Sequence, residues 1–115
     1  MGTQPFRVTS QPASRDGQTI LCVKGAISTT SSAAFQEAAL AATAPKLIID
    51  LSEAISVDSM AIGALVRVFV SCHKSGRKLA LVGLNHRVRN VLRITGVEEL
   101  FNTYATIREA EEGLA

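Results

Sequence analysis

The chain has 115 residues, a formal net charge of +2, 47% hydrophobic residues and only 4% aromatic residues. That length fits one domain over residues 1–115, and no stretch approaches the roughly 20 apolar residues that a membrane span needs. Weak charge and few aromatic rings disfavour nucleic-acid binding, which needs a continuous cationic surface or stacking rings. Residues 1–5 lack the basic start and apolar run of a secretory signal, so we expect a cytoplasmic protein.

Short apolar runs without polar alternation predict strands that are buried on both faces, and they lie at residues 19–23, 47–51 and 78–82. Helical patterns lie between these runs, which indicates parallel strands joined by crossover helices. Residues 6–10 alternate like an edge strand, and turn residues at 14–17 join them to the first buried run. We therefore expect an α/β fold that opens with a β-hairpin, with a mixed, mostly parallel sheet of four to five strands and about four helices.

Caps and periodicity predict where the helices lie. We expect them to begin within the hydroxyl-rich segment 28–32, near Asp58, after Asn85, and after the capping box at 106–109. Several hydroxyls could cap the first helix, which runs to about residue 42 ahead of Pro45. The second helix runs to about residue 74, and the third stops at Gly96. Residues 101–105 are expected to form a last short strand.

The second helix has two contrasting faces. Its predicted core face carries Ile62, Leu65, Val66, Phe69 and Cys72. The opposite face carries Met60, Gly63, Ala64, Arg67 and Ser71, with Val68 beside them. A solvated face normally has more charged residues, so this face is either a surface for a partner or is covered by another part of the same domain. Both interpretations stay open at this point.

The sequence contains no nucleophile elbow, phosphate-binding glycine loop or metalloprotease motif, so we expect no catalytic residue. We expect His73 in the core or at its boundary, and His86 on the surface. Clustered ligands for a metal are absent, and Cys22 and Cys72 are predicted to be buried, reduced thiols. An enzyme with Ser59 as nucleophile, and a small-molecule site at the carboxyl ends of the strands, remain as weaker alternatives.

The junction between the second buried run and the second helix stands out. Asp58 is a natural N-cap, which places Ser59 in the first helical turn, near the positive end of the helix dipole. A phosphate on Ser59 would be favoured by the dipole and the free amides, and opposed by the neighbouring Asp58 carboxylate. The alternative is an ordinary helix cap without modification.

Several segments, taken in order, resemble the STAS domain family, and in particular its anti-sigma factor antagonists. The family pattern is a buried strand ending in Asp-Leu-Ser, a hydrophobic turn, and then Asp-Ser-[Ser/Thr]-Gly-Leu-Gly. It is similar to residues 50–52 and 58–63 of this chain. Further similarity lies at residues 23–25, 78–83, 95–97, 100–101 and 109–110. The resemblance therefore extends over nearly the whole chain.

The resemblance implies a regulatory switch that uses no cofactor. In such proteins the unphosphorylated domain binds an anti-sigma factor, itself a serine kinase with a small ATP-binding fold, and so frees the sigma factor. The kinase phosphorylates the serine after the family's aspartate, and a separate phosphatase reverses this. Carried over, Ser59 would be the phosphoacceptor. With the weakly polar helix face, this places the expected partner-binding surface at Ser28, Asp58, Ser59, Met60, Gly63, Ala64 and Arg67.

The chain departs from the family pattern at three positions. Ser28 stands where the family often has aspartate, and Met60 and Ala61 replace a small hydroxyl residue and glycine. The alternative to a phosphorylated switch is therefore an unmodified scaffold in a larger assembly, such as a stress-sensing complex or a lipid-transport ATPase complex. The weakly polar face of the second helix leaves open both a weak homodimer and a hetero-complex.

Overall fold

A computed structural model of the chain describes residues 5–115, and residues 1–4, part of the segment on which the expected lack of a secretory signal rests, lie outside it. The strands are β1 (Arg7–Pro12), β2 (Gln18–Ile27), β3 (Lys46–Val57), β4 (Lys78–Val82) and β5 (Asn102–Tyr104). The helices are α1 (Ser32–Ala41), α2 (Ser59–Lys74), α3 (His86–Ile94), the short 3-10 helix η1 (Glu98–Leu100) and α4 (Ile107–Leu114). Within the described residues, no helix is both long and apolar enough to cross a membrane.

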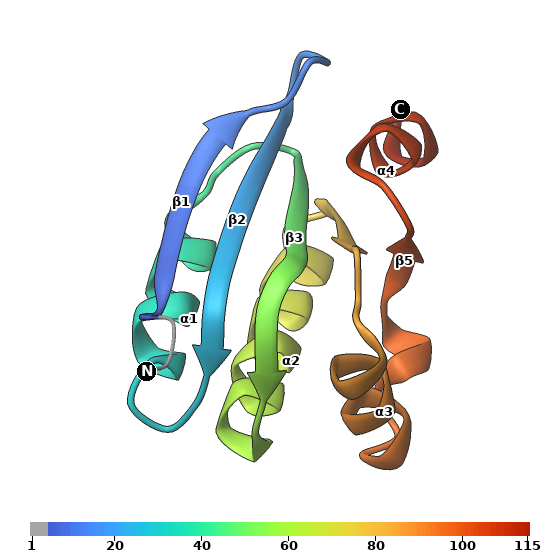
Figure 1. The fold of residues 1–115 in the computed structure, drawn as a ribbon. Helices are drawn as coiled ribbons and strands as arrows, with labels where there is room; N and C mark the ends of the chain where they lie inside the picture. Colours follow the sequence, from blue (N-terminus) through green and yellow to red (C-terminus); the bar gives the residue numbers. More distant parts are fainter. Residues whose placement is uncertain (1–4) are drawn as a thin grey trace.

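The strands form one sheet in the order β1-β2-β3-β4-β5 (Figure 1). β1 pairs antiparallel with β2, and all later neighbours pair in parallel. Gly17, with a φ of +78°, supplies the left-handed residue of the opening hairpin turn. The expected mixed, mostly parallel sheet that opens with a hairpin is therefore confirmed.

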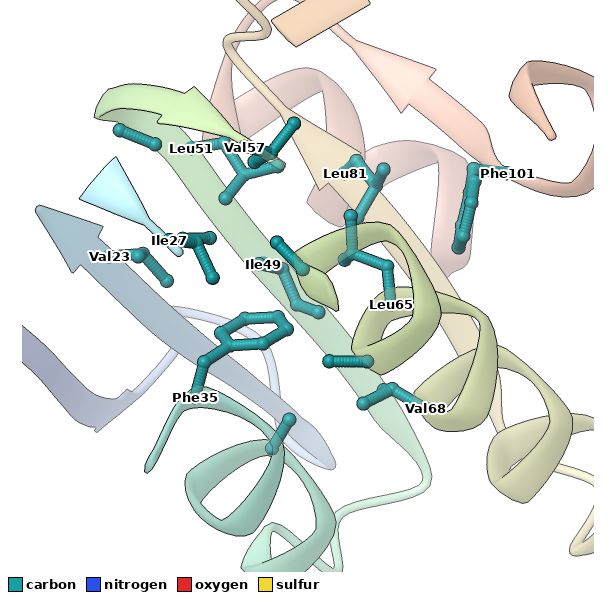
Figure 2. Close-up of a cluster of buried hydrophobic side chains, with 14 of the residues drawn as sticks. Val23, Ile27, Phe35, Ile49, Leu51, Val57, Leu65, Val68, Leu81 and Phe101 are labelled. Atoms are coloured by element: carbon teal, nitrogen blue, oxygen red, sulfur yellow. The ribbon is translucent and has the colours of Figure 1, made fainter. Parts of the chain in front are cut away.

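Both faces of the sheet are covered. Helices α1, α2 and α3 pack on one face, around a cluster that includes Phe35, Ile49 and Leu65. Figure 2 shows the Phe35 ring pointing from α1 into the space between the sheet and α2. Helix α4 covers part of the opposite face, where Ala110 and Leu114 pack on a second cluster. Consecutive residues of β3 pack alternately into the two clusters, which explains why its sequence is continuously apolar.

Strand β3 is longer than the apolar run at 47–51 predicts, because it continues to Val57. It stays paired with an equally extended β2 across irregularities that follow Cys22 and Gly25, up to the pair Ile27 and Val57. Along this extension only one face is buried, and the other carries the exposed ion pair of Lys24 and Glu53 at 3.7 Å. Residues 52–57 are therefore part of a strand, although their half-polar sequence does not predict one.

The C-terminal helix is tied to the opening hairpin by Glu111. The Ser14 hydroxyl and the Ser14 backbone N–H donate to the two carboxylate oxygens of Glu111, at 2.6 and 3.0 Å. The Gln18 side-chain amide donates to the backbone oxygen of Glu111 at 3.1 Å. Hydrogen bonds from Ser14, first from its hydroxyl and then from its backbone N–H, hold the pKa of Glu111 below its ordinary value. These contacts join the two ends of the described chain.

We expect the Glu111 contact to make stability depend on pH. Because the folded-state pKa is lowered, its contribution is complete above the ordinary glutamate pKa and is lost as the pH falls through the lower folded-state value. Urea unfolding of the wild type and of Glu111→Gln should show a wild-type advantage at pH 7 that shrinks in acid. Glu99→Gln, at an exposed residue that takes part in no ion pair within the described residues, is the control. A difference that is constant between pH 7 and acid would contradict this origin.

Candidate functional site

Ser59 is the first residue of α2, and its side chain is exposed. Helix α2 begins at the edge of the sheet where β2 and β3 end (Figure 1). Asp58 is the single residue between β3 and α2, and its carboxylate accepts from the Ala61 backbone N–H at 3.0 Å. The Asp58 backbone N–H donates to the carbonyl oxygen of Ile27 at 3.2 Å, which joins the two strand ends. The predicted N-cap is therefore confirmed, and it fixes the position of Ser59.

A loop of hydroxyl side chains flanks this junction. The Thr29 hydroxyl donates to the second carboxylate oxygen of Asp58 at 3.4 Å, and Ser28 lies beside it with its hydroxyl 3.1 Å from that of Thr30. Ser31 is the N-cap residue of α1, but its hydroxyl donates to the carbonyl oxygen of Ala26 at 2.9 Å rather than capping the helix. These hydroxyls form hydrogen bonds within the turn. The Ser31 hydroxyl does not cap α1, although the sequence predicted a cap from this segment.

A groove of about 730 Å³ runs between α1 and α2, with Ser59 in its lining. The α2 wall brings together five residues predicted from the sequence, Ser59, Met60, Gly63, Ala64 and Arg67. The α1 wall was not predicted, and it consists of Ser32, Ala33, Gln36, Glu37, Leu40 and Ala41. The sequence signal for this wall is the run of alanines in α1, which leaves its outer face as weakly polar as that of α2. Ser28 and Asp58 stand outside the lining, in the adjoining loop and cap.

Two residues assigned to the outer face of α2 are in fact buried. Ala64 is 4% exposed and Val68 is fully buried, because α1 packs along this side of α2. Met60, by contrast, is 54% exposed, and Gly63 and Arg67 are also exposed. The interpretation that another part of the domain covers this face is therefore correct for its inner half, and the outer half forms the groove.

Neither histidine pairs with Ser59. His73 was expected in the core or at its boundary, but it is exposed and stacks on Phe69 with a ring-centroid distance of 5.8 Å. It lies about four helical turns from Ser59, roughly 20 Å along α2. His86 is exposed at the start of α3, as predicted, and no hydrogen bond joins it to Ser59 in the described chain. Within residues 5–115, neither histidine is therefore placed to act as a general base for Ser59.

The cysteines are not arranged for chemistry. Cys72 is buried as predicted, whereas Cys22 is only half-buried and packs against the second cluster. Burial raises the pKa of both thiols, so both are protonated at neutral pH and are weak nucleophiles. Across residues 5–115, no group of three or more His, Cys, Asp or Glu side chains could hold a metal ion.

Together these features define a mixed α/β domain with an exposed serine at a helix start, beside an open groove rather than an enclosed cleft. The chain belongs to the STAS domain family, whose sequence model matches residues 10–110. The family expected from the sequence is thus confirmed.

Several similar proteins are named as anti-sigma factor antagonists. A candidate anti-sigma factor antagonist from Thermotoga neapolitana is 39% identical over 67 residues, which are 58% of this chain and 59% of that protein, so less than two thirds of the relative is matched. An anti-sigma factor antagonist from Mycobacterium paratuberculosis has the same fold, with a TM-score of 0.83 and 23% identity over 97% of both chains. The Bacillus cell fate determinant SpoIIAA, in its phosphorylated form, gives a TM-score of 0.70 and 13% identity over 96% of this chain and 100% of that one. Its unphosphorylated form gives a TM-score of 0.71 and 15% identity over 95% of each chain.

Asp58→Ala should lower the free energy of unfolding by about 1 kcal/mol, because it removes the acceptor for the Ala61 N–H and for the Thr29 hydroxyl. Asp58→Asn keeps an acceptor oxygen at the cap and should change stability much less. Urea unfolding of the two variants measures the difference. Equal stabilities of Asp58→Ala and the wild type would show that the cap contributes nothing.

Gly63→Ala should raise the free energy of unfolding by about 0.5–1 kcal/mol, because alanine favours a helix and an added Cβ meets no atom within 4 Å. The new methyl group would instead enter the groove. Gly83→Ala is the contrasting control, since its φ is +70° and an added Cβ would lie 2.7 Å from the Ser52 Cβ. A destabilised Gly63→Ala protein would mean that this part of α2 is not open.

Proposed function

We propose that this chain is a cytoplasmic anti-sigma factor antagonist that is switched by phosphorylation of Ser59. Unphosphorylated, it binds an anti-sigma factor that is a serine kinase, and the sigma factor is released. The observation that carries this proposal is the exposed Ser59 hydroxyl, held by the Asp58 cap at the edge of the α1–α2 groove. Membership of the STAS family and the names of its relatives support it.

The phosphorylation step needs ATP and a base from the kinase. The Ser59 Oγ attacks the γ-phosphorus of ATP, the new Oγ–P bond forms, and the bond from that phosphorus to the β–γ bridging oxygen breaks. ADP leaves, and the hydroxyl proton passes to the kinase base. Neither histidine of the described chain is placed to activate Ser59, so Ser59 acts as the substrate and the kinase supplies the base. A phosphatase restores the hydroxyl with water.

The domain can accept a phosphate at Ser59 without rearranging. A phosphoserine carries about −1.5 to −2 charges, and at the first residue of α2 it is favoured by the helix dipole. The Asp58 carboxylate opposes it, which offsets part of that stabilisation. We therefore expect the phosphorylated domain to keep its fold, and the phosphorylated and unphosphorylated structures of SpoIIAA are both similar to the fold of this chain.

The effect on binding follows from what surrounds Ser59 in the groove. The nearest lining residues on α2 are Met60 and Gly63, which cannot neutralise a phosphate. Arg67 is eight residues further along the helix, roughly 12 Å from Ser59 along the axis. A partner that seals this surface would have to desolvate an uncompensated charge, so phosphorylation should release it.

Ser59→Ala should abolish phosphate incorporation by the cognate kinase while keeping the binding of that kinase. Ser59→Glu should weaken binding by tenfold or more, since it adds an uncompensated charge. The measurement incubates the purified domain with radiolabelled ATP and, one at a time, the anti-sigma serine kinases of the same cell. Calorimetry of each pair gives the binding constants.

Ser71→Ala, on the same helix, and Thr29→Ala, beside Asp58, are the matched controls and should be phosphorylated normally. Phosphate that persists in Ser59→Ala would remove Ser59 as the acceptor. Tight binding that Ser59→Glu leaves unchanged would favour the unmodified scaffold. The presence of Ser28 where the family often has aspartate also supports that alternative.

A further inference from the structure

The lining of the α1–α2 groove combines exposed apolar side chains with small residues. Each wall carries one large, exposed apolar side chain. Leu40 of α1 is 39% exposed and Met60 of α2 is 54% exposed. Its α2 side is open at Gly63, where an added Cβ would meet no atom within 4 Å. Protruding walls and an open, small-residue lining allow the walls of one copy to enter the groove of another.

The charges on the two walls are also complementary. Each wall carries one exposed charged side chain, Glu37 on α1 and Arg67 on α2. Neither takes part in an ion pair within the described residues, where the salt bridges are Lys24–Glu53, Arg89–Glu98 and Arg108–Glu112. In a two-fold interface, the unpaired charge on each wall of one copy can pair with the opposite charge on the other copy, which gives two ion pairs.

The geometry of the helices permits this pairing. Both helices begin at the same edge of the sheet, and both follow strands that run in parallel (Figure 1). Glu37 lies about one and a half turns into α1, and Arg67 lies about two turns into α2. A two-fold axis along the groove would place α1 of one copy over α2 of the other, with Glu37 facing the second copy's Arg67 at a similar height.

We propose that the α1–α2 groove is a homodimer interface, in which Glu37 of each copy pairs with Arg67 of the other around an apolar contact of Leu40 and Met60. The strip is limited by the length of α1, about 15 Å, so the interface is smaller than a standard one and the dimer is weak. Because Ser59 lies in the same groove, the dimer would cover it and compete with any partner that reads it.

The test uses the chain alone. Sedimentation equilibrium from about 1 μM to about 1 mM should show a monomer–dimer equilibrium for the wild type. Glu37→Arg places arginine against arginine twice, and Arg67→Glu places glutamate against glutamate twice, so each variant should self-associate at least tenfold more weakly. Mixing the two variants pairs opposite charges again at both contacts, so the mixture should form a heterodimer with the wild-type affinity restored.

Arg87→Glu on α3 and Glu99→Arg in η1 make the same charge changes outside the groove and should leave self-association unchanged. A wild type that stays monomeric throughout the series would overturn the proposal. So would a dimer that ignores both groove variants, or a mixture that shows no rescue, since the contact would then lie elsewhere. None of these outcomes depends on a kinase, so the dimer and the Ser59 switch can fail separately.

Discussion

The double-sided burial of β3 is the constraint on which the rest of the structure depends. Leu47, Ile48 and Ile49 are all fully buried, and consecutive side chains of a strand point to opposite faces. Both faces must therefore be covered, by α1, α2 and α3 on one side and by α4 on the other. Helix α4 packs on β3, β4 and β5, and the extension of β3 past Leu51 keeps only one face buried.

The same constraint positions the candidate site. Covering one face of β2 and β3 requires α1 and α2 to pack side by side, with Phe35 filling the space between them and the sheet (Figure 2). Above this shared core the outer surfaces of the two helices diverge, and small residues leave the groove between them. With only Asp58 between β3 and α2, the start of the groove is fixed directly by the end of β3.

The sequence predicted the features that local chemistry determines. Continuous apolar runs indicate strands covered on both sides, and the Asp58 cap and its contact with Ala61 follow from residue type and position. What it missed depends on packing between elements. Ala64 and Val68 cannot be distinguished from solvent-facing residues until α1 is placed against α2. The polar end of β3 reads as a turn because its pairing with β2, rather than its own composition, makes it a strand.

Asp58 caps helix α2, and the proposed modification falls on its neighbour, Ser59. The Asp58 carboxylate holds the helix start through the Ala61 N–H and meets the hydroxyl loop through Thr29. In the described chain, no hydrogen bond is made by the Ser59 hydroxyl, so replacing its proton by a phosphate breaks nothing that holds the fold. A modification there would act on whatever covers the groove and leave the core intact. If Ser59 is phosphorylated as proposed, its charge changes at a position that the Asp58 cap holds but that does not itself cap the helix.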